Sequence, residues 1–290
     1  MKLESPLVST DWLAAHLGDD SLRIYDTTIY LRPNPDGCGY VPQSGRAEWE
    51  SAHVPGADFL DVVKELSDSS QPVPLMMPPA DKFAATMAAH GVSADSSVVL
   101  YNKGAPMWST RVWWMLRSIG FDNVAVLDGG YDKWARETCP LSDEVSAYPS
   151  GSLSAAPRHN MWADKNDMLK AVESGSLVTI NALSPEVYSG DTNQYGRAGH
   201  LPGTHNVFYG SLLDPETGEF LEPKALGPLF SASGALDADR VVTYCGGGIS
   251  ATMDCLALYL CGQRNVGVYD GSMSEWVRDE SLPLTLGARP

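Results

Sequence analysis

The two halves of this chain carry the same short sequence phrases in the same order. A His-Val-Pro-Gly turn begins at His53 and a His-Leu-Pro-Gly turn begins at His200. Each half then closes on an Asp-Gly phrase that ends in a tryptophan, Trp134 at 81 residues after the first turn and Trp276 at 76 residues after the second. Matched phrases at matched intervals indicate an internal duplication, so the chain is expected to fold as two copies of one unit.

Each half alternates strand-like and helix-like segments. Short apolar runs predict strands over 22–26, 97–101, 124–127, 177–180 and 241–244, and longer segments predict helices over 10–17, 81–90, 110–119 and 164–173. Strands that alternate with helices form parallel sheets with helices on both faces. The predicted fold class is α/β, with two domains that each contain a small, mainly parallel sheet flanked by helices.

Length and composition suggest where the domains divide. A chain of 290 residues is about twice the common domain length of ~100–150 residues, so two hydrophobic cores are expected. The segment 141–157 is rich in Ser, Pro and Ala and has no periodic apolar face, which is typical of a linker. We therefore predict an N-terminal domain over 1–140, a linker over 141–157 and a C-terminal domain over 158–290.

The charge of the chain limits its partners. The formal net charge is −16 and the isoelectric point is about 4.6. Long-range repulsion opposes binding to nucleic acid or to an anionic membrane, so neither is expected as a partner. No run reaches the ~18–20 apolar residues of a membrane helix, and no secretory signal is recognised. The five cysteines form no CxxC pair, which predicts neither a disulfide framework nor a zinc site. A cytoplasmic location is the expectation.

The segment 244–251 has the strongest chemical signal in the chain. Three glycines follow Cys245, and they separate a predicted strand from an apolar helix. Cys245 should therefore stand at the carboxyl end of a strand, where loop N–H groups and the positive end of the next helix favour an anion. The thiolate is the nucleophilic form of cysteine. The sequence predicts Cys245 as a nucleophile, beside a binding loop of Gly246, Gly247, Gly248, Ile249 and Ser250.

The matching position in the first half carries a different residue. Asn102 follows the strand predicted over 97–101, and an amide cannot act as a sulfur nucleophile. The N-terminal domain is therefore predicted to be catalytically inactive and to wall a cleft between the two halves. Cys255 and Cys261 lie in or after the apolar helix and are expected to pack in the core.

Together these phrases resemble the tandem-domain rhodanese and 3-mercaptopyruvate sulfurtransferase family. The matching segments cover nearly the whole chain in the family's order and are HVPGA at His53, RVWWMLRSIG at Arg111, LDGGYDKW at Leu127, GHLPG around His200, CGGGIS at Cys245 and YDGSMSEW at Tyr269. The resemblance implies two rhodanese-like domains, an inactive N-terminal one, and a C-terminal cysteine that carries a persulfide.

The reaction implied by the resemblance is sulfur transfer. Cys245 would take a sulfane sulfur from a small anionic donor, 3-mercaptopyruvate or thiosulfate, and pass it to cyanide, to a small thiol or to a reduced dithiol protein. No metal or organic cofactor is expected. A persulfide carrier or sulfur-sensing module without turnover is the alternative, because it shares the first step. A Cys-x5-Arg phosphatase is disfavoured, since the sixth residue after Cys245 is Ala251.

The donor-binding residues are assigned from the same resemblance. Thiosulfate-using members have basic residues directly after the cysteine, where this chain has glycines. Arg197 is the single basic residue between Lys170 and Lys224, and its place before the His200 turn favours donor binding over a surface role. His53 joins the substrate-binding candidates through a contact across the domains, although its matching turn in each half favours a structural role.

For one further residue the sequence leaves two roles open, and for three others it predicts a structural role. Ser250 would either donate to the sulfur of Cys245 or cap the following helix. Asp128 and Asp270 are expected to cap helices. Arg111, next to a pair of tryptophans, is expected to serve domain packing.

Overall fold

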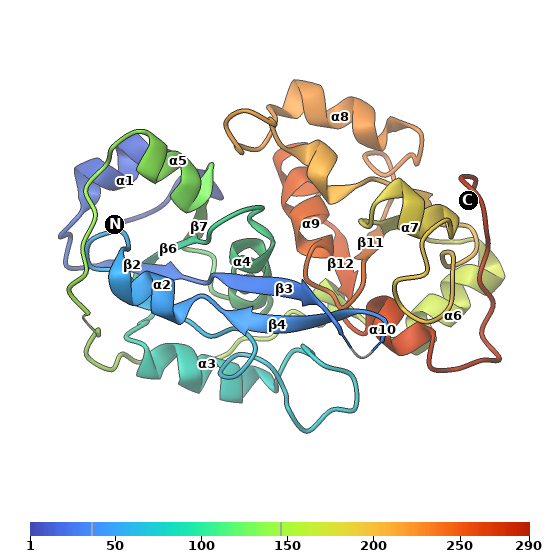
Figure 1. The fold of residues 1–290 in the computed structure, drawn as a ribbon, viewed down its shortest axis with the longest axis horizontal. Helices are drawn as coiled ribbons and strands as arrows, with labels where there is room; N and C mark the ends of the chain where they lie inside the picture. The colour runs from blue at the N-terminus through green and yellow to red at the C-terminus, as the bar shows by residue number, and fades with distance from the viewer. Residues whose placement is uncertain (36, 146) are drawn as a thin grey trace.

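A computed structural model describes residues 1–35, 37–145 and 147–290. Within these ranges the chain forms two five-stranded parallel sheets and one antiparallel hairpin. The sheets occupy separate halves of the molecule, the first in blue to green and the second in yellow to red (Figure 1). The predicted α/β class with two mainly parallel sheets is confirmed. One residue of the expected linker, at position 146, lies outside the described residues.

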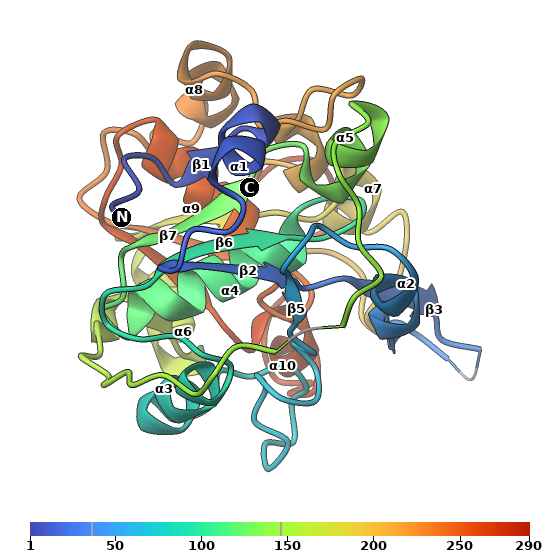
Figure 2. The ribbon, with the colours of Figure 1, turned by 90° about the vertical axis from the view of Figure 1, so that its left-hand side faces the viewer.

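The first sheet has the strand order β1-β7-β6-β2-β5. Helix α1 covers one face of this sheet and α4 covers the other (Figure 2). The elements of this half are β1 (Leu7–Val8), α1 (Thr10–His16), β2 (Leu22–Asp26), β3 (Ile29–Pro33), β4 (Tyr40–Ser44), α2 (Arg46–Ser51), β5 (Asp58–Phe59), α3 (Ala80–Ala89), β6 (Ser97–Tyr101), α4 (Met107–Ser118), β7 (Val124–Leu127) and α5 (Gly130–Arg136).

The second sheet has the strand order β10-β9-β11-β12-β8 and repeats the pattern. Its elements are the 3-10 helix η1 (His159–Met161), β8 (Trp162–Ala163), α6 (Lys165–Ser174), β9 (Val178–Asn181), α7 (Pro185–Ser189), β10 (His205–Asn206), the 3-10 helix η2 (Tyr209–Leu212), α8 (Pro223–Ser231), β11 (Val241–Tyr244), α9 (Ala251–Leu260), β12 (Val266–Tyr269) and α10 (Ser272–Trp276). Across the described ranges, no helix combines the length and apolar character needed to cross a bilayer.

The hairpin β3–β4 replaces part of what composition alone indicates to be a loop. Prolines and glycines are dense over 32–45, yet the backbone pairs antiparallel from Ile29 opposite Ser44 to Pro33 opposite Tyr40. A two-stranded ribbon has free edges, so the prolines interrupt no further ladder. The hairpin extends from the first half towards the second half (Figure 1), where Leu31, Tyr40 and Pro42 line a cavity together with Cys245. It brings N-terminal residues close to the C-terminal sheet.

The repeated His-x-Pro-Gly turns clamp a chain segment in each half. His53 and Ser142 exchange two backbone hydrogen bonds of 2.9 Å, and His200 and Thr285 exchange two of 3.0 and 2.9 Å. Both histidine side chains are fully buried. Nδ1 of His53 lies 2.7 Å from the carbonyl oxygen of Trp49, and Nδ1 of His200 makes the matching contact with a carbonyl in its own half. Both histidines therefore serve the same structural role.

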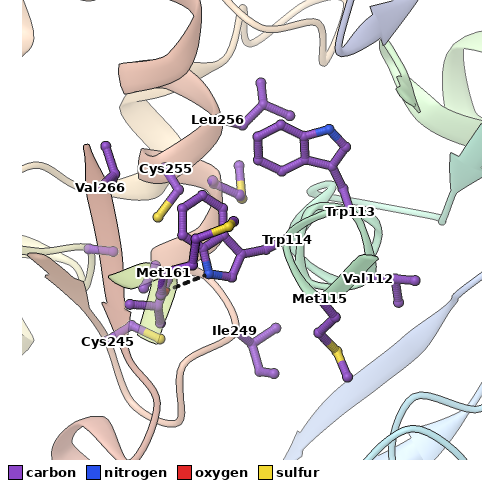
Figure 3. Close-up of a cluster of buried hydrophobic side chains, with 14 of the residues drawn as sticks. Val112, Trp113, Trp114, Met115, Met161, Cys245, Ile249, Cys255, Leu256 and Val266 are labelled. Atoms are coloured by element: carbon purple, nitrogen blue, oxygen red, sulfur yellow. Dashed lines mark hydrogen bonds between the residues drawn. The ribbon is translucent and has the colours of Figure 1, made fainter. Parts of the chain in front are cut away.

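The two halves meet along α4 and α9 in one continuous core. Trp113 and Trp114 of α4 point towards Cys255 and Leu256 of α9 (Figure 3). The hydroxyls of Thr110 and Thr252 lie 2.8 Å apart across the same boundary, and the other named side chains around them are buried. Burial of aromatic rings at this boundary stabilises a fixed arrangement of the halves. The expectation that Cys255 packs in the core is confirmed.

Candidate active site

Cys245 begins the loop between β11 and α9, at the carboxyl end of a central strand. Strand β11 lies between β9 and β12, so its end opens at the middle of the sheet edge. The Cys245 side chain is a free thiol and is only 2% exposed. It nevertheless lines a cavity of about 600 Å³ between the two halves of the chain. The predicted position of Cys245 at a strand end is therefore confirmed.

Ser272 holds the loop from below. Its Oγ accepts hydrogen bonds from the backbone N–H of Cys245 at 3.1 Å and of Gly248 at 3.0 Å, and it donates to the carbonyl of Tyr269 at 2.7 Å. Ser272 has a φ of +49°, a left-handed conformation that costs a non-glycine residue about 1–2 kcal/mol. The hydrogen bonds offset this strain. The serine thus fixes the backbone directly around the nucleophile.

The remaining loop amides are available to a ligand. The N–H groups of Gly246, Gly247, Ile249 and Ser250 have no protein acceptor in the part of the chain that the structure describes. The N–H of Gly248 is different, because Ser272 Oγ accepts it. The amide of Gly248 is therefore bonded within the protein, and the binding role predicted for this residue stays a prediction. Four free amides beside the start of α9 still form a favourable place for negative charge.

Two of the loop glycines have no room for a side chain. A β-carbon on Gly246 would lie 1.9 Å from Oη of Tyr195. A β-carbon on Gly248 would lie 2.7 Å from the carbonyl oxygen of Asp270, and Gly248 also has a φ of +71°. Glycine is the residue that accepts both constraints. The Gly-Gly-Gly sequence thus allows a tyrosine and an aspartate to approach the loop closely.

An arginine from the first half supports the same loop. Arg111 of α4 is 1% exposed, and it donates to Oδ1 of Asp270 at 2.7 Å and to the carbonyl of Gly248 at 3.1 Å. The other carboxylate oxygen of Asp270 accepts the N–H of Met77 at 2.6 Å. Charged hydrogen bonds of this kind are about twice as strong as neutral ones. The packing role expected for Arg111 therefore extends to direct support of the active loop.

The prediction that the two aspartates cap helices is wrong. Asp270 makes the ion pair with Arg111, and no side chain caps α10. Asp128 accepts the N–H of Phe220 at 2.8 Å, and no side chain caps α5. Both carboxylates bind groups of the opposite half, which the order of residues along the chain does not reveal.

The cavity is built from both halves of the chain. The first half supplies the hairpin β3–β4, the segment 67–75 and Met107, and the second half supplies the Cys245 loop, Tyr195 and the segment 274–278. Arg278 is the single cation among the described lining residues. Its NH1 donates to the carbonyl of Pro72 at 2.7 Å, and it forms no ion pair with the described acidic residues. Arg278 therefore provides positive charge at the wall of the cavity.

A second cavity of about 370 Å³ adjoins the first. Tyr195 and Ser250 line both cavities, whereas Cys245 lines only the larger one. Ser250 makes no side-chain hydrogen bond to cap α9, so the capping alternative for this residue is excluded. Its hydroxyl faces the cavities, together with Ile249 in the larger one. Among the residues described, no group of three or more His, Cys, Asp or Glu side chains is arranged to hold a metal ion.

Two residues expected at the site lie elsewhere. Arg197 donates to the carbonyls of Asp279 at 2.9 Å and Leu282 at 2.8 Å, and it does not line the cavity. The guanidinium of Arg197 therefore fixes the segment after α10, through hydrogen bonds to the backbone carbonyls of that segment. His53 is buried in the first half against the ring of Trp49, at 4.8 Å between ring centroids. Neither residue can contact a ligand in this cavity as the chain stands.

The functional residues that sequence reasoning did not assign are Tyr195, Arg278 and Ser272. Ser272 belongs to a repeated phrase, and its difference from Gly130 in the first copy was a usable signal. The other two have no motif around them. They reach the cavity only through the packing of distant segments.

The class of the protein follows from this fold and loop. The sequence pattern of the rhodanese-like domain matches residues 9–137 and 165–279, one copy in each half. The chain therefore belongs to the rhodanese family and carries two such domains.

Similar proteins narrow the class to sulfurtransferases. The chain is 31% identical to a 3-mercaptopyruvate sulfurtransferase of Escherichia coli K12 over 280 residues, which is 96% of each chain. It is 31% identical to the thiosulfate sulfurtransferase of Rattus norvegicus over 282 residues, 94% of this chain and 92% of the other. The crystal structure of SseA from Escherichia coli, a 3-mercaptopyruvate sulfotransferase, matches with a TM-score of 0.81 at 30% identity, over 92% of this chain and 98% of the other. These relatives support a role in sulfur transfer.

Proposed function

We propose that the protein transfers a sulfane sulfur from a small anionic donor to a thiol or cyanide through a persulfide on Cys245. One observation carries this proposal above the others. A buried free thiol lies at the floor of a cavity between the halves, next to four backbone N–H groups without a protein acceptor among the described residues. Such a site favours a sulfur anion and excludes most of the solvent around it.

The reaction proceeds in two steps at one sulfur atom. The Cys245 thiolate attacks the outer sulfur of the donor, and the bond between this sulfur and the rest of the donor breaks. The electron pair of that bond leaves with sulfite or with the carbon of pyruvate, and Cys245 keeps the sulfur as a persulfide. Free loop amides stabilise the persulfide anion. An acceptor thiolate or cyanide then attacks the outer sulfur and releases the Cys245 thiolate.

Arg278 takes the role of the cation that holds the donor. The loop itself has glycines where a basic residue would follow the cysteine, and Arg197 is engaged by backbone carbonyls. Arg278 lines the cavity and uses one nitrogen for the carbonyl of Pro72, and its other N–H groups have no acceptor among the described residues. A guanidinium binds carboxylate and sulfonate oxygens through paired hydrogen bonds. Both donor types carry such a group.

The division of labour between the halves is part of the proposal. The C-terminal domain over 158–290 performs the chemistry, and the N-terminal domain over 1–140 is inactive because Asn102 stands where Cys245 stands in the other. The inactive half contributes the hairpin and the segment 67–75 to the cavity wall. It also contributes Arg111 to the loop.

Mass spectrometry tests the persulfide directly. Purified protein is incubated with 3-mercaptopyruvate or thiosulfate, and the peptide that contains Cys245 is expected to gain one sulfur atom, which cyanide removes as thiocyanate. The variant Cys245→Ser is expected to gain none while its unfolding curve stays close to that of the wild type. A sulfur atom found on another cysteine would contradict the assignment. Persulfide formation without turnover in the presence of excess acceptor would instead favour the carrier alternative.

A further inference from the structure

The phenol of Tyr195 lies directly against the active loop. Its Oη occupies the space where the side chain of residue 246 would begin, as the 1.9 Å approach to a β-carbon on Gly246 shows. Tyr195 also lines the cavity that contains Cys245. The backbone neighbour of the nucleophile is thus in contact with a hydroxyl group from another segment. A side chain at position 246 would therefore displace the phenol of Tyr195.

The hydroxyl of Tyr195 has a proton to offer. Gln194 Nε2 donates to its oxygen at a long distance of 3.4 Å, and among the described residues no acceptor receives its own O–H. Burial raises the pKa of Tyr195 above that of a free tyrosine, and the negative charge of Cys245 raises it further. The phenol therefore stays protonated at neutral pH. It is a hydrogen donor against Gly246, in the cavity that Cys245 also lines.

The two donor types differ in whether they need such a proton. When a thiolate takes sulfur from thiosulfate, the S–S bond breaks and sulfite leaves as a stable anion. When it takes sulfur from 3-mercaptopyruvate, a C–S bond breaks and the leaving group is the enolate of pyruvate, which must gain a proton on carbon. General acid catalysis at such a step contributes roughly 10²–10⁴-fold. The loop carries no hydroxyl at Gly246 or Gly247 to perform it.

We propose that Tyr195 is the proton donor for a carbon leaving group, so that the preferred donor is a 3-mercaptopyruvate-type thiol acid whose C–S bond breaks. Cys245 forms the new S–S bond, the C–S electron pair passes to the enolate, and Tyr195 delivers its proton to the enolate carbon. The phenolate then takes the S–H proton of the new persulfide. Cys245 is left as the persulfide anion and Tyr195 returns to its neutral form. This inference rests on the function proposed above.

The variant Tyr195→Phe tests the proposal, since it removes only the hydroxyl. With 3-mercaptopyruvate we expect kcat/KM to fall by roughly 100-fold, within the range of a lost general acid. With thiosulfate we expect a change of less than about twofold, because sulfite needs no proton. Tyr209→Phe is the matched control, because Tyr209 lines the second cavity and not the one that contains Cys245. It should leave both rates unchanged.

Each other outcome has a definite meaning. Equal losses with both donors would assign Tyr195 to positioning of the loop and overturn its role as a proton donor. Unchanged rates of Tyr195→Phe with 3-mercaptopyruvate would also overturn its role as a proton donor. So would a result in which Ser250→Ala, and not Tyr195→Phe, lowers the rate with 3-mercaptopyruvate. A wild-type protein that accepts thiosulfate but not 3-mercaptopyruvate would also overturn this inference, while the Cys245 persulfide would still stand. A wild-type protein that forms no persulfide with either donor would instead refute the proposed function itself.

Discussion

The loops after β6 and β11 occupy the same place in the two halves but present different groups. In each half a tyrosine at the end of the strand accepts a backbone N–H of the His-x-Pro-Gly turn, from Val54 to Tyr101 at 3.2 Å and from Leu201 to Tyr244 at 3.1 Å. The carbonyl of the next residue accepts a backbone N–H from the Asp-Gly phrase in both halves. The frame around the two loops is therefore shared.

The loop of the first half is closed by its own side chain. Asn102 donates from Nδ2 to the carbonyls of Lys103 at 2.8 Å and Ala105 at 2.9 Å, and its Oδ1 accepts from the N–H and the hydroxyl of Ser109. Cys245 makes no such bonds, and the amides after it stay free in the described chain. The same surrounding structure can therefore hold either a loop whose polar groups bond one another or a loop with free amides that suit an anion. The difference is that the Asn102 side chain bonds carbonyls of its own loop, whereas four amides of the Cys245 loop have no acceptor in the described chain.

The Asp-Gly phrase below each loop shows the same contrast. Gly130 in the first half has a φ of +57°, and Ser272 at the matching position of the second half has a φ of +49°. Glycine adopts this conformation without strain, and serine does not. The serine is present where its hydroxyl is needed to accept the N–H of Cys245 and of Gly248. Of these two matching positions, only the one next to the Cys245 loop is strained.

Exchange of Asn102 and Cys245, the first residues of the two loops, should have the largest effect on activity. Cys245→Asn is expected to abolish sulfur transfer, and adding Asn102→Cys should restore none of it. A thiol at position 102 would face the carbonyls of Lys103 and Ala105, which repel a thiolate. Sulfur transfer and the pH dependence of thiol alkylation at position 102 measure the two parts. Recovery of even a few per cent of the wild-type rate would show that the frame, and not the loop, creates the site.

Removal of Arg111 should show how far the first half supports the Cys245 loop of the second half. Arg111→Met leaves the carboxylate of Asp270 buried without its partner, which costs about 3–5 kcal/mol of unfolding free energy. Chemical denaturation measures this loss, and persulfide formation should fall with it because Arg111 also binds the carbonyl of Gly248. The double variant with Asp270→Asn should recover part of the stability. If Arg111→Met changes neither quantity, the halves are independent.

Local sequence was sufficient to predict where Cys245 lies in the fold but not what surrounds it. A strand, three glycines and a helix place Cys245 at a sheet edge by rules that act within ten residues. Tyr195 and Arg278 belong to no motif, and they reach the cavity because separate segments pack there. The hairpin β3–β4 was hidden by its prolines for a related reason, since a free-edged ribbon tolerates them.

Two predicted donor-binding residues, Arg197 and His53, lie away from the cavity, for different reasons. Arg197 was expected to bind the donor because it is isolated in sequence and precedes a repeated turn. Its guanidinium is instead taken up by carbonyls of the segment after α10, and that neighbourhood is set by tertiary structure. For His53 the duplication itself contained the correct answer. A residue that occurs at the same place in both copies is more simply explained by the fold that the copies share. Both histidines are buried, and each exchanges two backbone hydrogen bonds with a distant segment of its own half.

The helices after the loops also differ, and the difference should appear in the pH dependence of stability. Arg111 of α4 is paired, whereas both carboxylate oxygens of Asp254 in α9 lack a partner among the described residues. Burial raises the pKa of Asp254 well above that of a free aspartate. The unfolded chain then loses its proton first as pH rises, so stability falls from about pH 4 up to the folded-state pKa.

Asp254→Asn removes this titration. Relative to wild type, the variant should gain about 1.4 kcal/mol of unfolding free energy per pH unit above pH 4, until the folded protein also ionises. Denaturation curves at several pH values from 4 to 8 measure the slope. The matched control is Asp68→Asn, an aspartate on the surface whose pKa is lowered by hydrogen bonds from Ser70 and Gln71. Because its pKa is lowered, Asp68→Asn should give a small slope of the opposite sign, confined to pH values below about 4, and no slope between pH 4 and 8. Parallel curves for Asp254→Asn and wild type would show that Asp254 has a partner in solution.

Replacement of Ser272 by glycine, the residue at the matching position 130, should have the smallest effect on stability. It distinguishes the cost of the left-handed backbone from the benefit of the serine hydrogen bonds. Ser272→Gly loses two accepted hydrogen bonds and one donated hydrogen bond, each contributing about 1 kcal/mol, and relieves left-handed strain of about 1–2 kcal/mol. The unfolding free energy should therefore fall by only about 1–2 kcal/mol, while kcat/KM falls roughly tenfold because the loop is held less firmly. Ser272→Ala keeps the strain and loses the bonds, so it should be the less stable of the two. A glycine variant with full activity would mean that the serine supports only the fold, and the contrast between Gly130 and Ser272 would carry no catalytic meaning.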